Sequence, residues 1–183
     1  MNTLPNNDAA EGSDLCKKAK APNTASTEEL GAAKKVVDPR MHSAEHVLTA
    51  TLMVMFGCAR PFTTHLEKKK SKADYLYTRD LTTEETKQVE ARVNEVIARN
   101  LSVREEFLPR CQVEQLYDLA RLPEDASETI RIVHIGDYDA CPCSGKHVNK
   151  TKDIGRFRIV STTYESGALR VRFKLDASLD LSQ

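Results

Sequence analysis

Residues 41–57, MHSAEHVLTATLMVMFG, are the stretch around which we expect the fold to form. From Val47 onward the segment is apolar on every side, and a helix that is hydrophobic all round is a buried helix. Asp38 suits the N-cap, Pro39 suits the first helical position, and Gly57 suits the left-handed residue that closes a C-terminus. The sequence therefore predicts a central helix that is enclosed by the rest of the chain.

Two histidines stand four residues apart near the start of this helix. His42 and His46 would share one helix face, because residues four apart have Cβ atoms about 5–6 Å from each other. Two imidazoles so placed can both bind one metal ion at about 2 Å. Together with Glu45 the motif also reads H-x-x-E-H, the inverted zinc-peptidase pattern, in which the glutamate is a general base. In the other interpretation, Glu45 only orients a histidine.

A second group of metal-binding residues lies about a hundred residues later, in a loop expected over residues 136–155. Cys143 and His147 are spaced C-x-x-x-H, and thiolates and imidazoles are both good zinc ligands. Cys141 is a competing ligand, although C-x-C spacing suits one tetrahedral ion less well. With His42 and His46, the two motifs predict a zinc site of three nitrogens and one sulfur.

The composition predicts one domain with a flexible tail. The chain has 183 residues, of which 40% are hydrophobic, and its 27 basic and 27 acidic side chains cancel. Any nucleic-acid contact must therefore be local. Residues 1–36 have few large apolar side chains, which predicts a flexible N-terminal tail before a domain at 37–183. The odd cysteine count and the lack of an export signal or an apolar span predict a cytoplasmic, non-membrane protein with reduced thiols.

The pattern of elements predicts an α+β fold. Thr82 and Glu85 form a capping box that begins a helix ending near Asn100. We expect strands at 73–79, 101–107, 129–135, 156–162 and 169–175, a short helix at 112–120, and a turn at 164–167. These elements give a single domain in which an antiparallel sheet wraps around the buried central helix.

The two motifs also resemble a known family. HSAEHVL at residues 42–48, followed by CPCSGKHVNKTKDIGRFRI at 141–159, is similar to the editing domain shared by alanyl- and threonyl-tRNA synthetases. The resemblance is closest to the stand-alone AlaX-type alanyl-tRNA editing proteins, and it covers roughly residues 38–175. It implies that the paired motifs bind Zn²⁺ and that the domain hydrolyses amino acids wrongly esterified to tRNA. Ser144 and Lys146 stand where the family usually has Gly and Thr.

The resemblance makes tRNA the expected partner, and no ATP-binding module is expected. Phosphate contacts could come from Lys146 and from Lys68, Lys69 and Lys70, called the loop lysines below. In most proteins such a run is a solvated loop. Four arginines alternate on adjacent strands and form either a tRNA surface or ordinary salt-bridged strands: Arg156, Arg158, Arg170 and Arg172.

Three functions are compatible with these residues. The first is a zinc-dependent, trans-acting deacylase of mischarged tRNA, acting on Ser- or Gly-charged tRNA(Ala). The second is a non-catalytic, zinc-stabilised module that binds tRNA or a synthetase, supported only by the altered Ser144–Lys146 loop. The third is a small H-x-x-E-H metallopeptidase, which leaves Cys143 and His147 unexplained.

Overall fold

The computed structural model describes residues 37–117 and 128–176 of the chain. Its first element is helix α1, Pro39–Phe56. The Asp38 side chain caps the helix by accepting a hydrogen bond from the backbone N–H of Arg40 at 2.9 Å. Gly57 ends it in the left-handed conformation, with φ of 66°. Both predicted ends of the central helix are therefore confirmed.

The burial of α1 follows the prediction only in part. Met41, Val47, Leu48 and Leu52 are at most 1% exposed and form the centre of the main hydrophobic core. In the last turn, however, Met53 is 38% and Val54 is 73% exposed. The prediction that the whole helix is enclosed was wrong for this turn, because α1 extends beyond the elements that cover its first four turns or so.

The strands form two antiparallel sheets rather than one. The four-stranded sheet has the order β1-β2-β7-β6, and the three-stranded sheet has the order β3-β4-β5. The first comprises β1 (Thr63–His65), β2 (Ser71–Leu76), β6 (Phe157–Glu165) and β7 (Ala168–Leu175); the second comprises β3 (Val103–Pro109), β4 (Thr129–Ile135) and β5 (Asp139–Pro142). The predicted α+β class is confirmed, and its strands are divided between these two sheets.

The β6–β7 hairpin provides one wall of the core. Its two turn residues, Ser166 and Gly167, have φ of 50° and 83°, as a two-residue hairpin turn requires. Along β7, alternate residues Leu169, Val171 and Phe173 are fully buried, which confirms the alternation expected of this strand. The hairpin thus places one apolar face of the sheet against α1.

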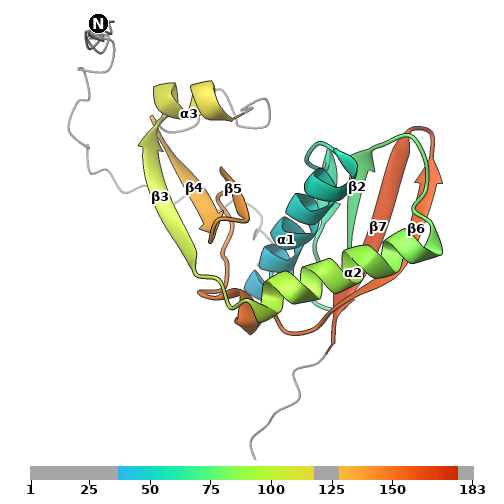
Figure 1. Ribbon diagram of the computed structural model, residues 1–183. Helices are drawn as coiled ribbons and strands as arrows, with labels where there is room; N and C mark the ends of the chain where they lie inside the picture. Colours follow the sequence, from blue (N-terminus) through green and yellow to red (C-terminus); the bar gives the residue numbers. More distant parts are fainter. Residues whose placement is uncertain (1–36, 118–127, 177–183) are drawn as a thin grey trace, which may run out of the picture. The chain divides into compact units, whose positions relative to one another are not determined.

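Helix α2, Thr83–Ala98, forms the other side of this core (Figure 1). Its capping box is present, because Thr82 and Glu85 each accept a hydrogen bond from the backbone N–H of the other. The helix contacts α1 and β6. Its buried face is made of three valines and one isoleucine: Val89, Val93, Val96 and Ile97.

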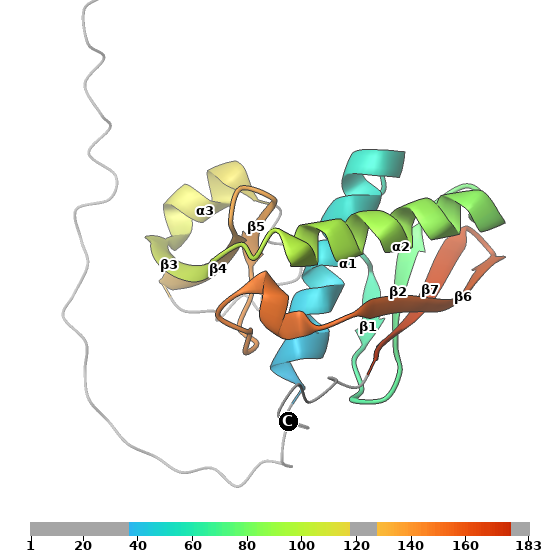
Figure 2. The same cartoon turned by 60° about the horizontal axis from the view of Figure 1, so that its bottom comes forward.

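The short 3₁₀ helix η2, Thr151–Ile154, anchors the segment that carries the second motif. The Thr151 hydroxyl is buried and bonds to the carbonyls of Val96 and Ile97 at the end of α2. On the other side, Nε of Arg40 donates to the Ile154 carbonyl at 3.0 Å. Figure 2 shows η2 beside α1 and α2, so this segment is fixed to both helices.

The remaining elements form a smaller apolar cluster. Helix α3, Arg110–Leu116, follows β3, and Val113 packs with Ile130 and Ile132 of β4. Residues 118–120 of the predicted helix and the predicted tail at 1–36 lie outside the described residues. In the two described ranges, no helix is long and apolar enough to cross a membrane.

Candidate metal centre

The structure brings the two sequence motifs together. His42 and His46 lie one turn apart on α1, with ring centroids 5.1 Å from each other. Cys143 directly follows β5, and His147 lies in the loop that continues towards η2. One ligand atom from each of the four residues can be chosen so that all lie within 4.8 Å of one another.

The separations between these atoms fit a zinc ion. Sγ of Cys143 lies 3.5 Å from Nε2 of His42 and 3.3 Å from Nε2 of His147. At the usual zinc–sulfur and zinc–nitrogen distances, two ligands of a tetrahedral ion lie about 3.5 Å apart. A donor set of three imidazoles and one thiolate is also a chemistry that zinc favours.

The charges of the cluster suit a cation. Burial alone raises the pKa of the Cys143 thiol, but hydrogen bonds from His147, His42 and His46 lower it to about 3. The sulfur is therefore a thiolate, the form that binds metals. Burial lowers the pKa of His147, which keeps that ring neutral and able to coordinate. For His46, burial also lowers the pKa, but hydrogen bonds to Asp139, Cys141 and Cys143 raise it well above its ordinary value. A metal ion would therefore have to displace one proton from the His46 ring.

Each histidine is supported differently at the nitrogen that lies away from the cluster. Nδ1 of His147 lies 3.1 Å from the Ser43 hydroxyl, which also accepts from the backbone N–H of Val148 at 3.2 Å. Nδ1 of His46 lies 3.1 Å from a carboxylate oxygen of Asp139. Nδ1 of His42 is buried and has no hydrogen-bond partner among the described residues.

A strand arginine fixes the loop that carries the sulfur. Nε of Arg131, on β4, donates to the Cys143 carbonyl at 2.8 Å, and its Nη2 donates to the Gly145 carbonyl. Gly145 lies directly against the His42 ring, since a Cβ there would come within 3.0 Å of two ring atoms. The loop and the first histidine are therefore closely packed together.

Cys141 belongs to a different part of this region. Its Sγ lies 3.5 Å from Nδ1 of His46, and it groups with His46 and Asp139 rather than with the four predicted ligands. Glu45 is buried on α1, where its Oε1 accepts a hydrogen bond from Thr49 at 2.7 Å. Asp139, and not Glu45, is thus the carboxylate that contacts a candidate ligand.

The predicted tRNA-contacting lysines are all at the surface. The loop lysines lie between β1 and β2, as expected of a hairpin loop, and Lys146 is exposed between Cys143 and His147.

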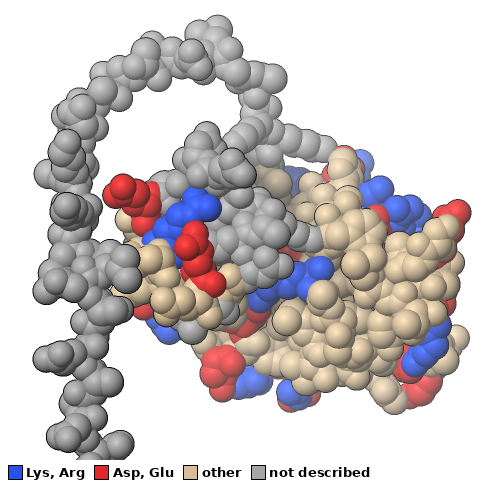
Figure 3. All heavy atoms as spheres, turned by 90° about the horizontal axis from the view of Figure 1, so that it is seen from above, with Lys and Arg blue, Asp and Glu red and all other residues tan. Residues whose placement is uncertain are grey.

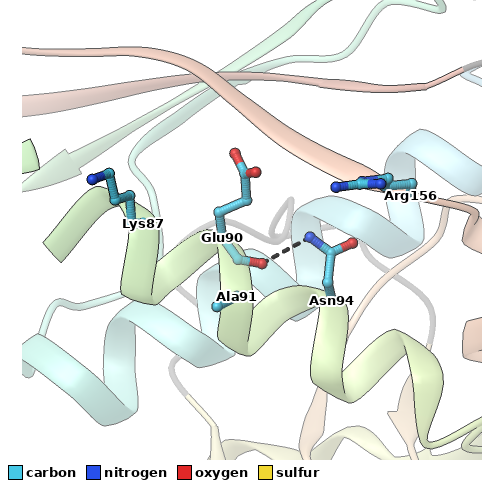
Figure 4. Close-up of a pocket in the computed structure, with 5 residues that line it drawn as sticks. All are labelled: Lys87, Glu90, Ala91, Asn94 and Arg156. Carbon is cyan, nitrogen blue, oxygen red and sulfur yellow. Dashed lines mark hydrogen bonds between the residues drawn. The ribbon is translucent and has the colours of Figure 1, made fainter. Parts of the chain in front are cut away.

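Figure 4 shows a separate pocket beside α2, where the Asn94 amide donates to the Glu90 carbonyl. Lys87, Ala91 and Arg156 complete its lining, and none of the candidate metal ligands contributes to it.

Sequence reasoning missed the residues that hold the ligands. Ser43 and Asp139 contact histidines 104 and 93 residues away, and Arg131 contacts Cys143 across a loop of the chain, 12 residues away. The one available signal was Arg131, a charged residue between two isoleucines of the strand TIRIVHI.

Comparison with known proteins agrees with this site. Residues 130–172, which include Cys143 and His147, match the family model described as "Threonyl and Alanyl tRNA synthetase second additional domain". This chain carries an AlaX-like domain related to the alanyl-tRNA synthetase editing region. His42 and His46 lie outside the range that the family model matches.

Individual relatives extend this similarity over most of the chain. The AlaX-like chain is 32% identical to "Alanine--tRNA ligase" of Paramagnetospirillum magneticum over 136 residues, or 70% of its length. It is 30% identical to the Halorhodospira halophila protein of the same name over 138 residues, or 72% of its length. For the Treponema denticola protein the identity is 29% over 143 residues, or 74%. These alignments span 15%, 15% and 23% of the three relatives.

Proposed function

We propose that this protein is a zinc-dependent, trans-acting hydrolase that deacylates mischarged aminoacyl-tRNA, with Ser- or Gly-charged tRNA(Ala) as substrate. The observation that carries the proposal is the convergence of His42, His46, Cys143 and His147 on one cluster in a domain related to alanyl-tRNA synthetase. The four residues come from two motifs about a hundred residues apart, and a packing role alone gives no reason for their meeting.

The chemistry to be catalysed is hydrolysis of the ester that joins an amino acid to the terminal ribose. Zinc bound by the four ligands would supply Lewis-acid polarisation and stabilise the charge that develops on the ester oxygen. Ser43 and Asp139 hold two of the ligand rings, and Arg131 holds the loop that bears the thiolate. Glu45 stays a candidate general base, a role that requires its carboxylate to reach the attacking water.

For the tRNA partner, we propose contacts from the loop lysines and Lys146. Three of the four strand arginines are less available, because each lies beside a carboxylate. Arg170 forms two hydrogen bonds with Asp74 at 2.7 and 2.8 Å. Arg158 lies 3.2 Å from Asp176, and Arg156 lies 4.0 Å from the same carboxylate. On the face seen in Figure 3, many Lys and Arg side chains likewise lie beside Asp or Glu. The exposed lysines are therefore better placed for phosphate contacts than the paired arginines.

The test is deacylation of a panel that includes Ser-, Gly- and Ala-charged tRNA(Ala). The zinc-loaded protein should hydrolyse the Ser- or Gly-charged forms faster than the correctly charged form, and His46→Ala should lose this activity. If the zinc-loaded protein hydrolyses none of them but binds tRNA, the non-catalytic module is the correct function. Cleavage of a peptide panel in place of the esters would instead support the metallopeptidase alternative.

A further inference from the structure

A chain of three side chains, of which the last two are buried, leads from a loop to one candidate metal ligand. Nη2 of Arg60, four residues after α1, donates to Oδ1 of Asp139 on β5. The other oxygen of Asp139, Oδ2, lies 3.1 Å from Nδ1 of His46. The Asp139 side chain is 4% exposed and the His46 side chain 5%. The same nitrogen of Arg60 also donates to the Ala140 carbonyl at 3.3 Å, so the guanidinium is fixed by the strand itself.

These contacts determine which nitrogen of His46 is free to coordinate. A carboxylate paired with an arginine is ionised and can only accept a hydrogen bond, so Nδ1 of His46 must carry a proton. When the ring loses its other proton to bind a metal, the nitrogen left to coordinate is Nε2. His42 and His147 also turn Nε2 towards the Cys143 sulfur, so all three rings would use the same atom.

We propose that Asp139, held by Arg60, is the positioning residue that fixes the tautomer and orientation of His46 as a metal ligand. The proposal rests on the zinc site described above but not on the reaction catalysed there. A ligand histidine usually donates its second N–H to such a partner, and loss of the partner weakens metal binding.

The same residues admit a competing interpretation, a second metal site made of His46, Asp139 and Cys141. The position of Arg60 argues against it. A second cation on Asp139 would lie beside a guanidinium that already occupies one carboxylate oxygen, and like charges at that distance repel. Cys141 then serves as a buried neighbour of His46 rather than as a ligand.

The support for His46 is stronger than that for the other two rings. His147 is held by a neutral hydroxyl, and Nδ1 of His42 has no partner in the described part of the chain. His46 is also the only one of the four candidate ligands that is classed as buried. Of the contacts that hold the three histidine rings, we therefore expect the Asp139 contact to do most to keep the site in one geometry.

The chain offers a closely matched control for this inference. The pair Asp74–Arg170 has side-chain exposures of 5% and 35%, against 4% and 32% for Asp139–Arg60. It lies on the four-stranded sheet, and neither of its members contacts a candidate ligand. Each pair can be changed in the same two steps. The single variant Asp→Asn leaves the arginine without its carboxylate, and the double variant Asp→Asn with Arg→Met also removes the charge of that arginine.

The experiment measures zinc affinity by chelator competition and the visible absorption of the cobalt-substituted protein. Asp139→Asn should lower zinc affinity about 10- to 100-fold, because an asparagine can present either its oxygen or its NH₂ to Nδ1 and no longer fixes the tautomer. The double variant Asp139→Asn/Arg60→Met should show the same loss and an altered cobalt spectrum. The matched Asp74 variants should bind zinc within about twofold of the parent.

Two results would overturn the inference. The first is that both Asp139 variants bind zinc as tightly as the Asp74 variants do. The other is recovery of affinity in the double variant, which would mean that the unpaired Arg60 charge, and not the loss of the His46 contact, caused the effect. Because these measurements use no tRNA, a protein that passes them but hydrolyses no mischarged tRNA would refute only the proposed function.

Discussion

The contact between Gly145 and the His42 ring leads to a sharp prediction about metal binding. A Cβ at position 145 would lie within 3.0 Å of Cε1 and Nδ1 of His42, and 3.3 Å from Nε2. Gly145 does not have a positive φ, so alanine meets no backbone penalty there. Gly145→Ala therefore tests the steric contact alone.

The size of the effect follows from the distances. Ordinary contact begins at 3.4 Å and the added Cβ would lie far inside that limit, so the ring or the loop must move by more than about 1 Å, whereas metal–ligand distances vary by only about 0.2 Å. Arg131 holds the loop through the Gly145 carbonyl, which leaves the ring as the part that moves. Overpacking of this kind costs about 1–3 kcal/mol, which corresponds to roughly 5- to 150-fold weaker zinc binding if the cost falls on the loaded state.

Zinc affinity measured by chelator competition, together with thermal unfolding, tests this reasoning. Gly57→Ala is the control, because position 57 has open space around it but a φ of 66°. It should lower stability by about 1–2 kcal/mol and leave zinc affinity unchanged. If Gly145→Ala bound zinc as tightly as the parent, the loop and ring would not be rigidly packed and the argument would fail.

Further predictions concern the ligands, the lysines and one capping residue. His46→Ala should sharply lower a zinc content of about one per chain, and Cys111→Ala, on exposed α3, should not, as metal analysis can show. Alanine at all three loop lysines should weaken tRNA binding and flatten its salt dependence, with zinc content unchanged. Lys146→Thr should raise the Michaelis constant for mischarged tRNA with little change in turnover number. Hydrogen bonding from Arg79 lowers the pKa of Glu85 from 4.5 to about 2, so its stabilising effect is full above pH 4.5 and lost as the pH falls towards 2. The difference in unfolding midpoint between the parent and Glu85→Gln should shrink over that range.

The helices could be predicted because their signals are local. Asp38 and Gly57 for α1, and the Thr82–Glu85 box for α2, use contacts within a few residues of each helix end. Such contacts are encoded by neighbouring residues and do not depend on the rest of the fold. Exposure of the last turn of α1 could not be predicted in this way, since apolar residues such as Val54 do not indicate how far the covering elements extend.

The division of the strands into two sheets depends on longer-range information. Alternation along a strand indicates which residues face a core, but not which strand is the neighbour. β5 was missed altogether because Asp139–Pro142 has no β-branched residue and ends in proline. Its place at the edge of the β3-β4-β5 sheet is consistent with that composition, since proline is tolerated on edge strands.

The two halves of the candidate site are built in different ways, which explains why one was easier to anticipate. His46 precedes Val47 and Leu48, which are both fully buried, so the core that orders α1 also orders its histidines. Cys143 and His147 lie on a loop with few buried apolar side chains, and polar contacts from Ser43 and Arg131 position that half. Apolar burial leaves a periodic signature in the sequence, whereas hydrogen bonds between residues 12 and 104 positions apart leave none. The residues that hold the candidate metal ligands can therefore be found only from the fold, even though the candidate ligands themselves are visible in the sequence.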